Sequence, residues 1–197
     1  MGEVQRIFYF HVGCAWNAFV AFFLVFACGI LYLVQRRPLW DQIGAASVEV
    51  GVIFTTIVLT TGPMWAKPVW NTWFPWDDPR VMTTLVMWLM YVAYLLLRSS
   101  LPEGDKKSKM SAVFGMICFI NVPIVYMSTE WWRTIHPKVI TSQGAQLAPR
   151  MIHSLLVAVV ACTVLLLSMI LLRSAMRLQE MVRTEIEIKL RERKRSR

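Results

Sequence analysis

The chain has 197 residues, of which 56% are hydrophobic and nine are tryptophan, and its formal net charge is +9. This apolar share excludes an ordinary soluble domain of the same length, because such a chain has too little polar surface to cover its apolar side chains. A positive charge can serve nucleic acid or a membrane surface, and here the basic residues gather in two short loops and a C-terminal tail. We therefore expect a protein of the lipid bilayer with no nucleic-acid partner.

Five apolar runs follow one another along the chain, at residues 14–34, 43–60, 81–97, 110–127 and 152–172. At a rise of about 1.5 Å per residue, each run reaches roughly 25 to 30 Å as a helix, which matches the hydrocarbon core of a bilayer. The first run is too long for a typical signal-peptide core and follows a polar, aromatic segment, so we expect it to be retained. The sequence predicts an all-α integral membrane protein with a bundle of about five transmembrane helices in residues 1–172.

Lysine and arginine indicate the orientation of the bundle. Arg36 and Arg37 follow the first run, further basic residues from Arg98 to Lys109 follow the third, and residues 173–197 are repeatedly basic. These segments share one side, and an excess of basic residues is typical of cytoplasmic loops. We expect a cytoplasmic C-terminus, whereas the N-terminus and the loops 61–80 and 128–150 lie outside.

Residues 173–197 are interpreted as a basic cytoplasmic tail. A set of apolar residues recurs there at every fourth position between charged residues: Leu178, Val182, Ile186 and Leu190. Such a stripe allows a helix to lie along lipid headgroups, but it also suits a simple cytoplasmic anchor helix, which we favour.

Polar residues are few within the apolar runs. Glu49 lies inside the second run, where an unpaired carboxylate is costly, so we expect it to face the bundle and to be paired or protonated. Asn17 and Asn121 lie in two other runs, and the three residues together do not define a polar pathway. The four cysteines form no CxxC pair, so we assign them no redox or metal chemistry.

The predicted outer loop 61–80 contains four tryptophans and a phenylalanine: Trp65, Trp70, Trp73, Phe74 and Trp76. An interfacial aromatic belt places one or two such residues at a helix end. Two interpretations remain open. The loop is either a belt with a packed re-entrant segment, or a flat aromatic platform for a large planar ligand.

Two of the three histidines fall on the same outer side. His11 precedes the first run and His136 lies between the fourth and fifth, whereas His153 at the mouth of the last run is expected to be an interface residue. Each alone suits a hydrogen-bonded interfacial role. Two imidazoles beside an aromatic platform add a second interpretation, a haem site with both axial positions filled, and the residues alone leave both interpretations open. Basic residues on this side that can pair with haem propionates are Lys67, Arg80, Arg133 and Lys138.

The segment PVWNTWFPWD, at residues 68–77, resembles the tryptophan-rich signature of haem-handling proteins of cytochrome c biogenesis, most closely the haem exporter protein C family. Residues 2–12 (GEVQRIFYFHV) and 121–136 (NVPIVYMSTEWWRTIH) are similar to the segments around that family's two ligand histidines. The three motifs occur in the same order and cover most of the chain.

The resemblance implies a non-enzymatic protein of the bacterial inner membrane. Such a protein presents non-covalently bound b-type haem on the outer, periplasmic face and assists its transfer to a periplasmic haem chaperone during cytochrome c maturation. Its further partners are ATP-binding-cassette transporter subunits and a very small membrane subunit. The resemblance implies that His11 and His136 are the iron ligands. It also implies that the core of the haem-binding signature consists of Trp70, Trp73, Trp76 and Asp77.

The chain departs from the family pattern at three places in the loop. Asn71 stands where a glycine is usual, Phe74 where a tryptophan is usual, and Asp78-Pro79 adds a residue before Arg80. Asp77 is expected to accept a hydrogen bond from an indole or to orient the loop backbone. The family also commonly has an additional span before its first ligand histidine.

Two other classes of function remain as alternatives. A related synthetase component ligates haem to the apocytochrome, but such relatives are larger and carry histidines within the membrane, and no predicted span here has one at mid-depth. A transporter or quinone-linked electron carrier without haem would use Glu49 as a proton site and the tryptophans as a belt.

Overall fold

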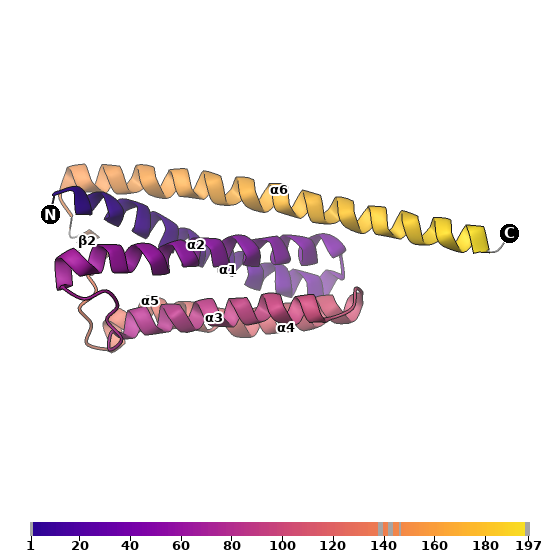
Figure 1. Cartoon of the computed structure of the whole chain (residues 1–197), viewed down its shortest axis with the longest axis horizontal. Helices are drawn as coiled ribbons and strands as arrows, with labels where there is room; N and C mark the ends of the chain where they lie inside the picture. The colour runs from indigo at the N-terminus through magenta and orange to yellow at the C-terminus, as the bar shows by residue number, and fades with distance from the viewer. Residues whose placement is uncertain (1, 138–139, 142–143, 146, 196–197) are drawn as a thin grey trace.

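A computed structural model of the chain describes residues 2–137, 140–141, 144–145 and 147–195, and helices make up most of them (Figure 1). After a short 3-10 turn, η1 (Gly2–Val4), the elements are α1 (Gln5–Gln35), α2 (Pro38–Trp70), α3 (Pro79–Ser100), α4 (Asp105–Phe119), α5 (Asn121–Trp131) and α6 (Pro149–Arg195). Two-residue strands β1 (Ile140–Thr141) and β2 (Gly144–Ala145) pair antiparallel between α5 and α6. Five helical segments are long and apolar enough to cross a membrane, with α4 and α5 forming one of them. The predicted all-α membrane fold is confirmed.

The helices run back and forth, so that the connections lie at two ends of the bundle (Figure 1). The N-terminus, the α2–α3 connection and the α5–α6 connection share one end, here called the cavity end. The α1–α2 and α3–α4 connections lie at the opposite end, and α6 projects beyond it. α1 packs against α2, α4 and α6 and is therefore the central helix of the bundle.

Close packing at the centre depends on a glycine. Phe22 of α1 stacks on Tyr91 of α3, with ring centroids 3.6 Å apart and planes 3° from parallel. Gly51 of α2 lies against the same phenylalanine, and a Cβ at position 51 would come within 2.6 Å of its Cε1 atom. Only a residue without a side chain permits this approach, as is common between helices in membranes.

The fourth apolar run forms one span, as predicted, but the helix is interrupted at Ile120, between α4 and α5. Pro123 has no N–H to donate to the carbonyl of Phe119, so the regular hydrogen-bond ladder cannot continue through this point. Asn121 uses its side-chain amide to donate to the carbonyl of Thr83 in α3, at 3.0 Å. Within the described chain, α4 packs on α1, whereas α5 packs on α3 and α4 rather than on α1.

The predicted outer loop 61–80 is shorter than expected, because α2 continues to Trp70. Pro63 and Pro68 lie inside this extension, and such prolines are tolerated in membrane helices where neighbouring groups satisfy the freed backbone. The helix ends at Asn71, whose φ of 55° is the left-handed conformation that glycine or asparagine adopts at helix ends. Asparagine at this usual glycine position therefore preserves the turn.

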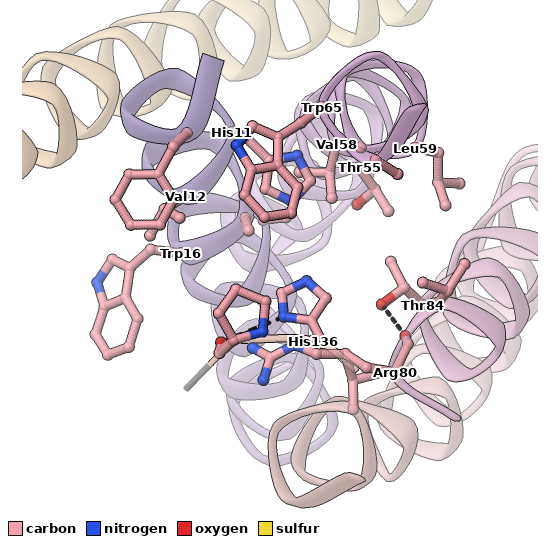
Figure 2. A pocket seen from close by; sticks show the side chains of 18 of the residues that line it. His11, Val12, Trp16, Thr55, Val58, Leu59, Trp65, Arg80, Thr84 and His136 are labelled. Carbon is pink, nitrogen blue, oxygen red and sulfur yellow. Dashed lines mark hydrogen bonds between the residues drawn. The ribbon is translucent and has the colours of Figure 1, made fainter. Parts of the chain in front are cut away.

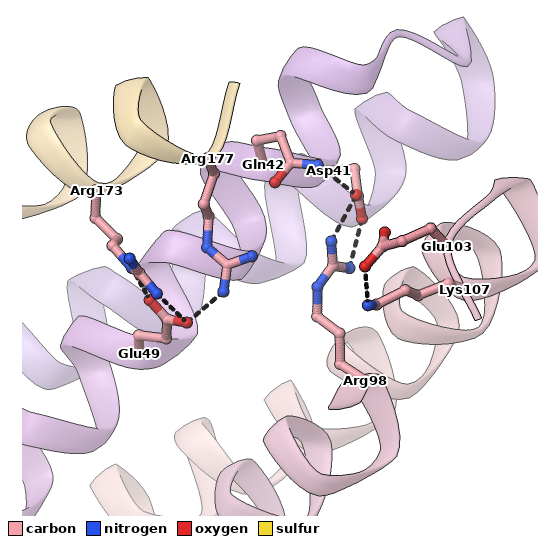
Figure 3. Close-up of polar contacts among 8 residues, drawn as sticks. All are labelled: Asp41, Gln42, Glu49, Arg98, Glu103, Lys107, Arg173 and Arg177. Atoms are coloured by element: carbon pink, nitrogen blue, oxygen red, sulfur yellow. Dashed lines mark hydrogen bonds and ion pairs between the residues drawn. The ribbon is translucent and has the colours of Figure 1, made fainter. Parts of the chain in front are cut away.

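Charged residues within the bundle form ion pairs (Figure 3). The expectation that Glu49 is paired is confirmed, because its carboxylate accepts hydrogen bonds from Arg173, at 2.5 and 3.3 Å, and from Arg177. Arg98, expected in the loop after the third run, is instead buried at the end of α3 and donates two hydrogen bonds of 2.7 Å to Asp41 of α2. Pairing of this kind offsets the desolvation of both charges.

Helix α6 is unbroken over 47 residues, which corresponds to about 70 Å at the usual helical rise. The predicted boundary between residues 172 and 173 lies within this helix, and Arg173 and Arg177 still contact α2. Beyond them the apolar residues Val182, Ile186 and Leu190 are exposed. The proposed tail is thus a straight continuation of the last span.

Candidate functional site

A cavity of about 1100 Å³ lies at the cavity end of the bundle, lined by α1, α2 and α6 on one side and by α3, α5 and the loops on the other (Figure 2). Its volume slightly exceeds the roughly 300–1,000 Å³ that is usual for small-molecule sites. Large aromatic residues contribute much of the wall, namely Phe8, Trp16, Phe19, Trp65, Trp70, Trp73, Phe74 and Tyr126. The cavity is suited to a large ligand with an extended apolar surface.

His11 of α1 and His136 of the α5–α6 connection both line this cavity. Figure 2 shows the two imidazoles entering from opposite sides, with His136 beside Arg80. His153, on α6, is exposed and lies outside the set of described residues that line the cavity. The structure therefore brings together the two histidines that the sequence analysis paired.

The hydrogen bonds of the two imidazoles determine which ring nitrogen carries the proton. Nδ1 of His11 lies 2.9 Å from Oγ1 of Thr61, and that hydroxyl donates its only hydrogen to the carbonyl of Ile57 at 2.7 Å. Thr61 must therefore accept from Nδ1–H. Nδ1 of His136 lies 3.4 Å from the carbonyl of Pro137, which can only accept. Both rings then keep the lone pair on Nε2, as metal-binding histidines commonly do.

The surroundings of His136 favour its neutral form. Burial, together with the nearby positive charge of Arg80 and the neighbouring His11, lowers the pKa of His136 to about 4. A neutral imidazole at physiological pH is the form that binds a metal. His136 is therefore ready to act as a ligand without first losing a proton.

Four basic residues were considered for the site, and Arg80 among them lines the cavity. Lys67 instead donates to the carbonyl and side chain of Asn71, at 3.4 and 3.1 Å, and Arg133 is exposed on the connection. Lys138 lies outside the described residues. Arg80 thus places a positive charge in an otherwise largely apolar cavity.

The tryptophans of the signature occupy different positions. Trp70 and Trp73 line the cavity, and the ring of Trp70 lies 6.2 Å from that of His136 at an angle of 63°. Trp76 is 68% exposed and lies outside the lining, where it packs on Phe74 with ring centroids 4.5 Å apart. Trp65, counted in the loop but not assigned a role, packs edge-on against Trp70 and lines the cavity. Its buried Nε1 finds no hydrogen-bond partner among the described residues.

The hydrogen bonds expected of Asp77 are made by its neighbour. Asp77 is exposed and has no hydrogen bond to another described residue, whereas Asp78 is only 3% exposed and caps the first turn of α3. The reason is Pro79, which occupies the first helical position and makes the residue before it the N-cap. The Asp-Pro pair is a sequence signal for such a cap, and it could have indicated Asp78.

The fold and the cavity together define a class of protein, a multi-pass α-helical membrane protein with an aromatic cavity into which two histidines project. Comparison with known proteins narrows this class. The heme exporter protein C family matches residues 1–190. The chain therefore belongs to the heme exporter protein C family.

Individual relatives agree with this assignment. Heme exporter protein C of Bradyrhizobium diazoefficiens is 30% identical over 170 residues, which cover 85% of this chain and 64% of the relative. The protein of the same name from Escherichia coli is 31% identical over 135 residues, 68% of this chain and 55% of the relative. A putative cytochrome c biosynthesis ccmC-like mitochondrial protein of Marchantia polymorpha is 30% identical over 147 residues, 74% and 61% of the two chains. The chain thus spans between about half and two thirds of the length of these relatives.

Proposed function

We propose that the protein holds haem in this cavity and passes it on during cytochrome c maturation, as a carrier of haem and not as an enzyme. The observation that carries the proposal is the pair of imidazoles, His11 and His136, which line one aromatic cavity with Nδ1 hydrogen-bonded and the lone pair left on Nε2. Iron in a porphyrin takes two such ligands, one above and one below the ring. Non-covalent, b-type binding follows, because the cavity offers ligands and apolar contact.

The remaining residues of the cavity suit a porphyrin. Trp70 and Trp73 offer flat apolar surface to the macrocycle, and Trp76 supports Phe74 from outside. Arg80 is placed to pair with a propionate carboxylate, and the unpartnered Nε1 of Trp65 is a second donor for it. The cargo supplies the metal centre, and the chain supplies two ligands, an aromatic wall and a counter-charge.

The proposed setting is the bacterial inner membrane. The cavity end is assigned to the periplasm because the basic connections and the extension of α6 lie at the opposite end. A periplasmic haem chaperone would receive the haem from this side. The family resemblance further supports association with ATP-binding-cassette transporter subunits and a small membrane subunit.

The polar residues considered for a transport pathway have structural roles instead. The side-chain amide of Asn17 donates to the carbonyl of Gly13 at 2.9 Å, and that of Asn121 binds the backbone of α3. Glu49 is held by two arginines of α6. These contacts link or stiffen helices, so they favour no second function.

The test is the haem content and spectrum of the protein purified from haem-replete cells. A pyridine haemochrome assay should find b-type haem in near-stoichiometric amount, with a six-coordinate low-spin spectrum. His11→Ala and His136→Ala should each give a five-coordinate or mixed spectrum that added imidazole restores, whereas the exposed control His153→Ala should not. A colourless wild-type preparation, or loss of the low-spin signature in His153→Ala alone, would reject the proposal.

A further inference from the structure

We propose that Asp78 and Thr134 form a tether that positions His136 at the cavity. The tether joins the first turn of α3 to residues 134–136, the segment that ends at His136. It rests on the proposed function in one respect, because the positioned imidazole is taken to be a ligand of haem iron. Asp78 and Thr134 act through His136 and are positioning residues.

Asp78 divides its carboxylate between two segments that are more than fifty residues apart in sequence. Oδ1 accepts from the backbone N–H groups of Arg80 and Val81, at 3.0 and 3.2 Å, and so caps α3. Oδ2 accepts from the hydroxyl of Thr134 and from the backbone N–H of Ile135, at 3.1 Å for the latter. One buried side chain therefore ties the connection after α5 to the start of α3.

Thr134 extends the tether to the histidine itself. Its hydroxyl donates to Asp78 and accepts from the backbone N–H of His136 at 3.0 Å. Residues 134, 135 and 136 are thus all held, directly or through one hydroxyl, by the same carboxylate. The direction in which the His136 imidazole leaves the backbone follows from this arrangement.

Packing contributes little to holding this segment. Ile135 is 54% exposed, and Trp131, Trp132 and Arg133 before it are also exposed. Apolar burial therefore cannot fix the course of the chain here, and the hydrogen bonds to Asp78 do so instead. The carboxylate is in turn stabilised by the N-terminus of α3, where the helix dipole favours negative charge.

The chemistry of asparagine allows the tether to be broken separately from the helix cap. Asparagine is as good an N-cap as aspartate, so Asp78→Asn can keep the amide oxygen on α3. The other oxygen becomes an NH₂ group, which cannot accept from Thr134 or Ile135. Thr134→Val removes the hydroxyl at nearly constant volume, and Thr134→Ser, as its matched control, restores it.

The first measurement uses the full-length protein without haem. Hydrogen–deuterium exchange of the peptide around residues 133–137, followed by mass spectrometry, should be at least about tenfold faster in Asp78→Asn and Thr134→Val. That factor is ~1.4 kcal/mol, the scale of one lost hydrogen bond. Thr134→Ser should exchange at the wild-type rate. Wild-type exchange in both Asp78→Asn and Thr134→Val would overturn the tether.

The second measurement uses the haem-loaded protein. Asp78→Asn and Thr134→Val should lose part of the low-spin spectrum and recover it with added imidazole, while Thr134→Ser keeps it. Asp77, the position that the family resemblance indicates, provides the comparison. If Asp77→Asn loses part of the low-spin spectrum while Asp78→Asn and Thr134→Val keep it, the tether is overturned and haem binding still stands.

The two proposals fail in different ways. If the wild type binds no haem, or if His136→Ala leaves its spectrum unchanged, the proposed function fails, and the exchange rates of the haem-free protein still decide the tether. If Asp78→Asn does not accumulate in the membrane, Thr134→Val decides it, because that change leaves the cap of α3 intact.

Discussion

Arg173 of α6 donates a hydrogen bond of 2.5 Å from Nε to the carboxylate of Glu49 in α2, across 124 positions of sequence (Figure 3). Arg177, one helical turn further on, binds the other carboxylate oxygen. The two arginines together fix how far α6 is displaced along α2, because a shift of one helical turn would leave only one of them beside the Glu49 carboxylate. The sides of α6 and α1 also approach closely, with Gly13 against Ala158 and Cys162.

Removal of the Glu49 carboxylate should weaken the packing of α6. Glu49→Ala leaves two arginines without their acceptor, and because the group is partly exposed we expect a loss of roughly 1 kcal/mol, or a few degrees in Tm. Thermal unfolding in detergent measures it. The matched control is Glu187→Ala, which removes an exposed pair with Arg183 and should leave Tm unchanged. Equal Tm values for both variants would contradict the role of Glu49.

The buried pair of Asp41 and Arg98 should be far more sensitive to the loss of one partner. Both side chains are less than a tenth exposed, so Arg98→Met strands a carboxylate and should cost about 3–5 kcal/mol. Asp41→Leu combined with Arg98→Met removes both charges and should recover most of that loss. A double variant as unstable as the single one would show that the pair is not what stabilises this end of the bundle.

The aromatic wall should contribute to haem retention according to position. Trp70→Ala and Trp73→Ala remove rings that line the cavity and should weaken haem binding about three- to tenfold. Trp76→Ala should have a smaller effect, because its ring supports Phe74 from outside. Trp40→Ala, at the opposite end of the bundle, is the control. Haem titration at matched protein abundance measures the affinity of each variant. An equal loss of haem affinity in all four variants would show that the aromatic wall has only a structural role.

The lowered pKa of His136 predicts a specific dependence on pH. Because the folded pKa is about 4 and the ordinary value is about 6.5, the unfolded chain binds more protons between these values. Stability from this residue is therefore complete above pH 6.5 and is lost progressively as the pH falls toward 4. The Tm of the haem-free wild type should decline between pH 6.5 and 4.5 more steeply than that of His136→Ala. Parallel curves would contradict the burial of a neutral imidazole.

The orientation of the bundle can be tested by labelling. In a chain whose four cysteines are replaced, Arg133→Cys should react with a membrane-impermeant maleimide in intact cells. Lys106→Cys, in the first turn of α4, should react only after the membrane is opened. Both sites are exposed, so access to the two faces alone decides the result. The reverse pattern would place the cavity in the cytoplasm.

Much of the fold could be predicted because a membrane span is recognisable from its length and its hydropathy. The five runs were recognised in this way, and the paired state of Glu49 followed from the cost of a bare carboxylate. The effect of individual prolines on the helices was harder to predict. The segment that contains Pro63 and Pro68 was predicted to lie in an outer loop, although α2 continues through it, and the break at Ile120 within the fourth span was not predicted.

The site was predictable to a similar degree. Histidine and tryptophan are conspicuous against an apolar chain, so the residues that could form a haem site were visible, and His11, His136, Trp70 and Trp73 do share one cavity. The position of Trp76 outside that cavity depends on the direction of single side chains, which spacing alone does not specify.

The break at Ile120 has a consequence for how the two imidazoles are held apart. At the cavity end, α3 and α5 form one half with the connection that bears His136, while α1 and α2, which bear His11 and Thr61, form the other with α6. Each imidazole is therefore fixed to its own half. The distance between the two imidazoles depends on how the two halves pack against each other along their shared interface, here called the seam. Contacts deeper in the bundle close that seam, among them the stack of Phe22 on Tyr91, a hydrogen bond of 2.8 Å from Trp88 to Thr56, and the ion pair of Arg98 with Asp41. The gap between the imidazoles is thus set by residues that touch neither of them.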